Sequence, residues 1–186
     1  MRPVTRDELL DYVTYSEQRL VLRAEAMAAK AERRLFVGPH LTFCFENRTT
    51  TRYQVQEMMR VERLVKESDI AHELNTYNDL LGGDGEIGAT LFVEIDDEPL
   101  RDRLLTRWID LMPHLFLRLP DGRKAPARWD EAQIGRGRLS AVQYLKFHVG
   151  GVTPVAIGCD HPDPLLAHEV PLTEAQREAL DADLAG

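Results

Sequence analysis

The segment "IGATLFVEI" (residues 87–95) decides the fold class, because apolar residues recur in it at every second position. This alternating set is Ile87, Ala89, Leu91, Val93 and Ile95. Successive side chains of a strand point to opposite faces of its sheet, so the pattern predicts a strand with one face in a core.

Further strands are predicted on both sides of this segment. Glycine-containing turns at Gly38-Pro39 and Asp121-Gly122 each separate two short apolar runs, as in a hairpin. The predicted strands cover residues 35–37, 41–46, 114–118, 123–129, 141–149 and 155–159. The stretch 161–171 has no regular pattern.

Helices are predicted in blocks rather than in alternation with the strands. Capping boxes begin at Thr5 and Thr173, and Ser68 is a third candidate N-cap. The predicted helices cover residues 5–14, 17–34, 51–67, 69–81, 100–111 and a C-terminal segment. The helix at 17–34 has one apolar stripe made of Leu20, Val21, Ala24, Met27, Ala28 and Ala31. We therefore expect a single α+β domain over residues 1–186, a mainly antiparallel sheet with N-terminal and central helices packed on it.

Composition excludes several classes of function. A net charge of −8 argues against a nucleic-acid partner, which would need a basic face. No apolar run approaches the roughly 20 residues that cross a bilayer, and the acidic N-terminal segment does not resemble a signal peptide. We expect a cytoplasmic protein that forms a homo-oligomer, with Cys44 and Cys159 as reduced core thiols.

The helix that follows Phe45 carries three polar residues inside its apolar arc: Gln54, Glu57 and Glu62. Gln54 fits either a capping box with Thr51 or a ligand contact. Glu57 fits either the rim of the arc or a metal site. A buried Glu62 needs a cation, which Arg48, Arg52 or a bound metal would supply.

Other polar residues extend this list of candidates. In the next helix Glu73 and Asn78 flank the apolar stripe, and His72 faces away from it. Gln143 shares a strand face with apolar residues, so its amide needs a buried partner. His161 follows an apolar strand, where site residues often lie. The ligand-binding candidates are Arg48, Arg52, Gln54, Asn78 and Gln143, and the metal-binding candidates are Glu57, Glu62, His72, Glu73 and His161.

Several standard catalytic motifs are absent from the sequence. It contains no phosphate-binding loop, Cys-x-x-Cys, His-Glu-x-x-His, Gly-x-Ser-x-Gly or di-iron Glu-x-x-His pair. A standard nucleotide, zinc or serine-hydrolase site is therefore not expected.

Nearly the whole chain resembles a known protein family. The resemblance is carried by five segments in order: "VGPHLTFCFENRTTTRYQVQEMMRVER", "HELNTYNDLLGG", "GATLFVEI", "LSAVQYLKF" and "GCDHP". The sequence resembles the bacterial family called domain of unknown function 3501 (DUF3501). The resemblance implies a role near a rubrerythrin-like protein and an iron–sulfur oxidoreductase, beside which members tend to be encoded. It implies no catalytic residues, since none is assigned in the family.

The residues and the resemblance leave two hypotheses open. The first is a ligand-binding or accessory subunit linked to a rubrerythrin or iron–sulfur redox system. The second is a small metal-dependent redox enzyme whose inward carboxylates bind iron or manganese.

Overall fold

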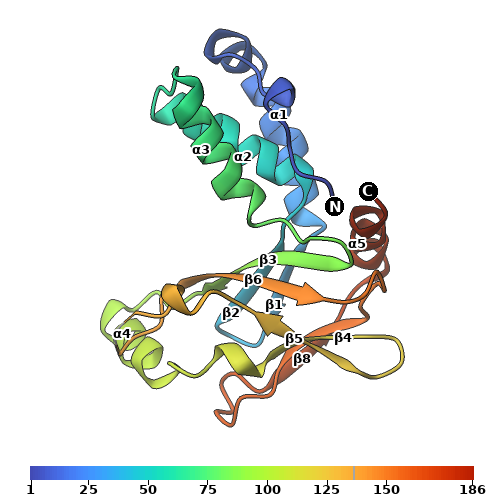
Figure 1. The fold of residues 1–186 in the computed structure, drawn as a ribbon. Coiled ribbons are helices and arrows are strands. Elements are labelled where there is room, and N and C mark those ends of the chain that lie inside the picture. The colour runs from blue at the N-terminus through green and yellow to red at the C-terminus, as the bar shows by residue number, and fades with distance from the viewer. Residues whose placement is uncertain (136) are drawn as a thin grey trace.

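This computed structural model describes residues 1–135 and 137–186 and places eight strands in one antiparallel sheet (Figure 1). Strand β3 (Glu86–Val93) is an inner strand of this sheet, paired on both sides. The other strands are β1 (Arg34–Val37), β2 (Leu41–Phe45), β4 (Leu115–Arg118), β5 (Lys124–Arg128), β6 (Val142–His148), β7 (Ala156–Cys159) and β8 (His168–Pro171). The alternation in β3 therefore predicts the correct element.

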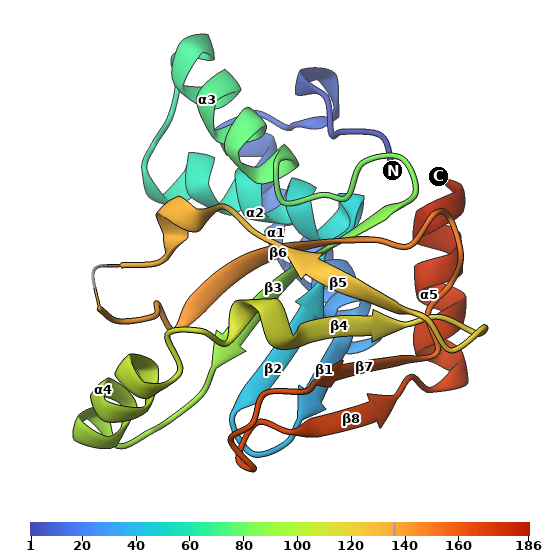
Figure 2. The same ribbon diagram turned by 60° about the horizontal axis from the view of Figure 1, so that its bottom comes forward.

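The order of strands is β1-β2-β3-β6-β5-β4-β7-β8, and the sheet curves until its two edges approach each other (Figure 2). Gly38 in the β1–β2 turn has a φ of +64°, and a Cβ there would lie 2.2 Å from a ring carbon of His168. Only glycine fits this backbone conformation and this close approach. The ladder between β5 and β6 is short, with two registered pairs, whereas β3 and β6 share seven.

The long helices are α1 (Tyr12–Ala31), α2 (Arg48–Val61), α3 (Glu67–Asn78), α4 (Glu98–Arg107) and α5 (Glu174–Ala185), with short 3₁₀ turns η1 (Arg6–Glu8), η2 (Met112–His114) and η3 (Glu131–Gln133). Figures 1 and 2 show α1, α2 and α3 grouped above one face of the sheet, whereas α4 and α5 lie at its opposite ends. This arrangement confirms the predicted α+β class with a mainly antiparallel sheet.

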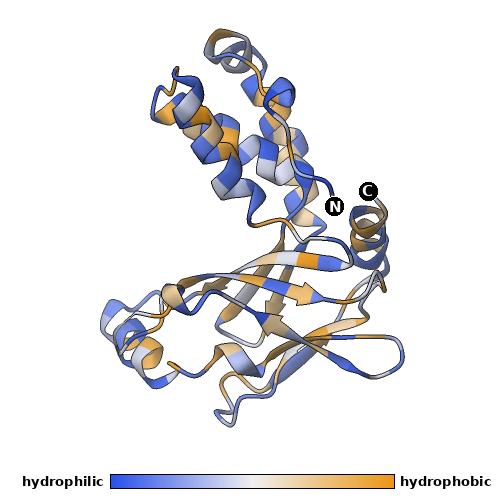
Figure 3. Cartoon of the chain, viewed as in Figure 1, coloured by the Kyte–Doolittle hydropathy of each residue, from blue (hydrophilic) through white to orange (hydrophobic). Residues whose placement is uncertain are grey.

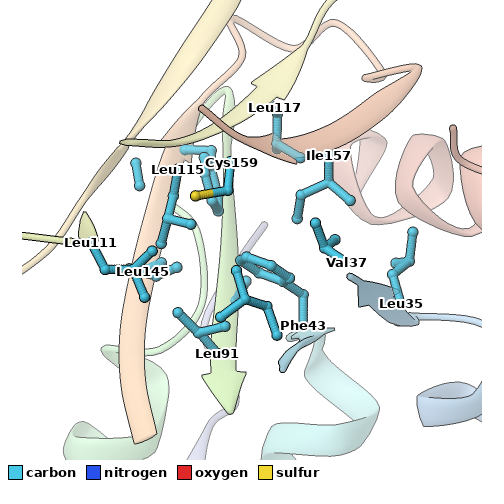
Figure 4. Packing of buried hydrophobic residues seen from close by; sticks show 14 of the residues in the cluster. Leu35, Val37, Phe43, Leu91, Leu111, Leu115, Leu117, Leu145, Ile157 and Cys159 are labelled. Atoms are coloured by element: carbon cyan, nitrogen blue, oxygen red, sulfur yellow. The ribbon is translucent and has the colours of Figure 1, made fainter. Parts of the chain in front are cut away.

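The main core lies inside the curved sheet. Its residues include Phe43, Leu91, Leu117, Leu145 and Ile157, which point toward one another in Figure 4. A second, smaller cluster joins the helices above the sheet and is made of Val4, Leu9, Val55, Met59, Ile70 and Leu74. Figure 3 shows hydrophobic and hydrophilic residues mixed along these helices. The helical layer therefore has its own core, separate from that of the sheet.

The predicted capping boxes at Thr5 and Thr173 are confirmed by the structure. Thr5 begins only the short turn η1, and Asp11 caps α1 by accepting hydrogen bonds from the backbone N–H groups of Val13 and Thr14. The predicted break at residues 14–16 is therefore wrong. The two hairpin turns are confirmed, with a φ of +87° at Gly122.

The apolar stripe of α1 does not pack into a core, which corrects the prediction for that helix. Leu20 and Val21 are 78% and 64% exposed, and α1 buries Tyr15 and Ala26 instead. These two lie on the opposite side of the helix from the stripe, and Tyr15 contacts α2 through Glu57. Self-association of the chain stays a prediction.

The helix α2 differs from the prediction at both ends. Asn47, not Thr51, is its N-cap, and its partner in the capping box is Thr50, so Gln54 has no capping role. The helix ends at Val61 and Arg63 adopts a left-handed φ of +54°, so the predicted continuation to residue 67 is wrong. The following helix begins after Lys66 rather than Ser68 and ends before the glycines at residues 82–83.

Two further differences depend on contacts between distant segments. Gln56 lies outside the apolar arc of its helical wheel, which predicts a water-facing side chain, yet it is buried. Its amide accepts a hydrogen bond from the backbone N–H of Leu10 and donates one to the carbonyl of Leu10. Strand β8 forms in the stretch that has no regular pattern, because it pairs with β7. No helix of the described residues combines the length and the apolar composition needed to cross a lipid bilayer.

Candidate functional site

The main candidate site is a cavity of about 260 Å³ between the helical layer and the outer face of the sheet, hereafter the interlayer cavity. Its lining residues come from α1, α2, α3 and the first strands of the sheet. They are Lys30, Arg34, Cys44, Glu46, Thr51, Gln54, Tyr77, Leu80, Thr90, Phe92, Val142 and Tyr144.

Strand register explains the floor of this cavity. Cys44 of β2 lies opposite Thr90 of β3, and Thr90 lies opposite Tyr144 of β6. All three project from the face opposite to that of Phe43, Leu91 and the other core residues, because side chains alternate along each strand. The side chains of β3 that alternate with its core residues therefore form a second row, of mixed polarity, on the cavity side of the sheet.

Glu46 follows β2 and places a half-buried carboxylate in the cavity. Its Oε1 accepts a hydrogen bond of 2.7 Å from the hydroxyl of Thr90, and its Oε2 accepts one of 3.0 Å from the hydroxyl of Thr50. Among the described residues, no cationic side chain comes within 4.0 Å of this carboxylate. The two hydroxyls fix its orientation without neutralising its charge.

Two cations line the same cavity. Arg34 pairs with Glu94 at 2.9 Å, and both of these side chains are about half exposed. Lys30 is half-buried, and within residues 1–135 and 137–186 no carboxylate lies within 4.0 Å of its ammonium group. The interlayer cavity therefore contains one carboxylate and one ammonium group that lack an ion-pair partner in that part of the chain.

The thiol of Cys44 also lines the cavity. Burial, followed by the nearby charge of Glu46, raises the pKa of Cys44 to about 11. The thiol is protonated at neutral pH and is a poor nucleophile. Cys159 is buried in the main core, where burial raises its pKa to about 11. Both cysteines are buried and unbridged, in agreement with the prediction of reduced thiols.

Of the predicted ligand-binding residues, Gln54 lines the interlayer cavity. Arg48 instead donates hydrogen bonds to the carbonyl groups of Arg2 and Pro3 and pairs with Glu8, so it anchors the N-terminal segment. Arg52 lines two smaller cavities, of about 180 and 100 Å³, on the other side of α2.

The other two predicted ligand-binding residues have structural contacts. The amide of Asn78 accepts a hydrogen bond from the backbone N–H of Val4 at 2.8 Å and donates one to its carbonyl at 2.9 Å. Gln143 points into the main core, where its Nε2 donates to the carbonyl of Ser140 and its Oε1 has no hydrogen-bond partner. It lies on the face of the sheet opposite to the cavity.

The predicted metal-binding residues are not brought together. Glu57 forms a two-bond ion pair with Arg19, at 2.7 and 2.9 Å, and accepts a hydrogen bond from the hydroxyl of Tyr15. Glu62 is the C-cap of α2 and is exposed rather than inward-facing, and His72 is exposed on α3 while Glu73 is half-buried there. His161 lies elsewhere, in the loop after β7.

Among the described residues, one group of three potential metal ligands forms, and it contains His161 together with Asp110 and His114. One ligand-type atom from each lies within 4.8 Å of the others. The hydrogen bonds of His114 are compatible with metal binding. Its Nδ1 lies 2.9 Å from the carboxylate of Asp160. Hydrogen bonds from Lys124 and His114 hold the pKa of Asp160 below its usual range. The ionised Asp160 accepts the Nδ1 proton, which leaves Nε2 of His114 with a free lone pair.

His161 does not fit a metal in this arrangement. Its Nδ1 accepts a hydrogen bond of 3.0 Å from the backbone N–H of Asp163, so the ring proton is on Nε2 and is donated to Asp110 at 3.2 Å. A metal on Nε2 would require the ring proton to be on Nδ1, where it would point at the backbone N–H of Asp163. The three residues instead join the loop after β7 to the segment after α4.

Sequence reasoning misses most of the cavity. Glu46 and Thr90 fall there only within predicted strands, and Lys30 only within a predicted helix. The sequence contains one signal of the cavity, in the strand residues that do not face the core. Among them, Cys44, Thr90 and Phe92 are not the strongly polar residues that a solvent-facing row would carry. That row indicates that both faces of the sheet are covered.

Two comparisons relate this chain to known proteins. A family model described as "Protein of unknown function (DUF3501)" matches residues 3–184. A crystal structure of a novel protein of unknown function from Burkholderia pseudomallei K96243 aligns with a TM-score of 0.88 and 32% sequence identity, covering 98% of this chain and 100% of the other. None of the curated proteins matches the chain.

Proposed function

Because this chain belongs to the DUF3501 family, whose description names no activity, we propose its function from geometry: it is a binding protein that holds a small organic molecule in the interlayer cavity. The observation that supports this most is the convergence of polar side chains from both layers, Gln54 from above and Glu46 and Thr90 from below, on one partly enclosed cavity. Small-molecule sites commonly combine a concave apolar wall with a few such polar groups.

Binding without catalysis is the form of this proposal that the residues favour. The Cys44 thiol has a pKa of about 11 and is protonated at neutral pH. The carboxylate of Glu46 is already held by two hydroxyl donors. The volume of about 260 Å³ is near the lower limit of ligand pockets, roughly 300 Å³, which suits a metabolite rather than a large cofactor.

The accessory role beside a rubrerythrin-like or iron–sulfur protein stays a prediction from the family resemblance. It is compatible with a binding protein, because a ligand sensor or carrier needs no redox centre of its own. The alternative of a metal-dependent enzyme is less well supported, because the hydrogen bonds of His161 oppose metal binding at its Nε2.

A neutral fluorescent probe tests the proposal without knowledge of the natural ligand. We expect 2-naphthol to bind the wild-type protein saturably with one site per chain. Gln54→Phe fills the cavity from α2 and should weaken binding at least about tenfold. Glu17→Phe adds the same ring at an exposed position of α1 that lines none of these cavities and should leave binding unchanged. Unsaturable binding, or equal affinity in all three proteins, would overturn the proposal.

A further inference from the structure

The interlayer cavity contains two opposite charges that do not neutralise each other. Lys30 enters it from α1 and Glu46 from the end of β2, and both are half-buried. The two side chains do not form an ion pair with each other, and within residues 1–135 and 137–186 neither has another partner within 4.0 Å. By contrast, the half-buried carboxylate of Glu57 in α2 is paired with Arg19.

Each unpaired charge has capacity for a ligand. A carboxylate offers about four acceptor positions, and Glu46 uses two of them for Thr50 and Thr90. An ammonium group has three donors, and no hydrogen bond from Lys30 to another side chain is formed among the described residues. Half-buried charges gain most from a partner that enters the same low-dielectric space.

A ligand with one charge would meet repulsion in this cavity. An anion that approaches Lys30 and Arg34 is repelled by Glu46, whereas a cation that approaches Glu46 is repelled by Lys30 and Arg34. A molecule that carries both charges satisfies both groups at once. Its uncharged part would lie against the aromatic side chains of Tyr77, Phe92 and Tyr144, which line the same cavity.

We propose that the ligand of the interlayer cavity is a small zwitterion of the α-amino-acid type, whose ammonium group binds Glu46, whose carboxylate binds Lys30 and whose side chain packs on the aromatic wall. This inference rests on the proposed function, since it specifies the ligand of the same cavity. The thiol of Cys44 lines the same cavity and needs no reaction in this scheme.

The test compares three molecules that share one uncharged part. Calorimetric titrations use phenylalanine, 3-phenylpropionate and 2-phenylethylamine, and a second series uses alanine, propionate and ethylamine. In at least one series the amino acid should bind at least about tenfold more tightly than both singly charged analogues, because a charge-assisted hydrogen bond is lost with each group.

Two variants then assign each charge to its side chain. Lys30→Gln should bind the amino acid only as tightly as the wild-type protein binds the corresponding amine. Glu46→Gln should bind the amino acid only as tightly as the wild-type protein binds the corresponding carboxylate. Glu25→Gln, at an exposed position of α1, is the control and should change neither. Circular dichroism of each variant verifies that the fold is intact.

The outcomes separate this inference from the proposed function. Equal or tighter binding of a singly charged analogue in both series, or no binding of any of the six molecules while 2-naphthol still binds, overturns the zwitterion but not the binding role. If Gln54→Phe also leaves 2-naphthol binding unchanged, both proposals fail.

Discussion

Glu57 and Glu62 lie five positions apart, and a helical wheel drawn through residue 67 places both among apolar neighbours. The wheel is correct for Glu57, which is mostly buried between Arg19 and Tyr15. It fails for Glu62 because α2 ends one residue earlier. The sequence carries no glycine or asparagine near this end, so the usual signal of a C-terminus is missing.

The first prediction concerns these two carboxylates. Glu57→Gln should lower the free energy of unfolding by about 1–3 kcal/mol, because Arg19 loses its charged partner in a partly buried place. Glu62→Gln is the matched control and should change stability by less than about 0.5 kcal/mol, since this residue is exposed. Urea denaturation of the three proteins at pH 7 measures both effects. Equal losses in the two variants would contradict the assignment.

The pH dependence of the same ion pair supplies a second prediction. The hydrogen bond from Arg19 lowers the pKa of Glu57 from its ordinary 4.5 to about 2, against an opposing effect of burial. Because the pKa is lower in the folded state, this stabilisation is complete above pH 4.5 and is lost as the pH falls toward 2. The stability difference between wild type and Glu57→Gln should therefore shrink between pH 4.5 and 2 in urea titrations. A difference that grows on acidification would be inconsistent with this pairing.

At the scale of elements, the sequence predicts those whose signals are local. Thr173 and Gln176 lie in one turn of chain and cap α5, and Gly122 supplies the positive φ of its hairpin. The outward stripe of α1 and the strand β8 depend instead on which partner lies beside them. Such partners are fixed by tertiary contacts, as between β7 and β8, and no single window of sequence contains them.

The loop after β7 gives the third prediction. His161→Phe should destabilise the protein by about 1–3 kcal/mol, because the N–H of Asp163 and the carboxylate of Asp110 lose their partner. Manganese, ferrous iron or zinc at millimolar concentration should leave the wild-type unfolding midpoint unchanged, because the proton on Nε2 of His161 opposes coordination. The exposed His72→Phe serves as the control for the substitution. A metal-dependent rise of the midpoint in wild type that His161→Phe abolishes would restore the metal hypothesis.

At the scale of the whole molecule, the two separate apolar clusters predict unequal local stability. The cluster inside the curved sheet is larger than the one that joins α2 and α3 to the N-terminal segment. Hydrogen exchange should therefore be slowest in β3 and β6 and faster in α2 and α3, which can open without disrupting the sheet. Exchange measured by mass spectrometry on peptides from each element reports the order. Protection in α2 equal to that in β3 would indicate one cooperative unit instead.

The candidate site is also a property of the whole molecule, which limits its prediction from sequence. Gln54 belongs to a helix that the sequence predicts, and its inward position follows from the helical wheel. Lys30, Glu46 and Thr90 come from three other segments, and they share a cavity because the register between β2 and β3 and the placement of α1 bring them together. The sequence predicts the helix or strand to which each of these residues belongs. It does not predict which residues of the other segments lie beside it in the folded protein.

The short ladder between β5 and β6 has a mechanical consequence. With two registered pairs against seven between β3 and β6, it is the weakest line across the sheet, and a pulling force should tear the sheet there into two leaves. The strands that form the floor of the interlayer cavity, β2, β3 and β6, all belong to one leaf. The other leaf, β5-β4-β7-β8, shares the main core with the first, so separating the leaves would expose that core but leave the floor of the cavity in one piece.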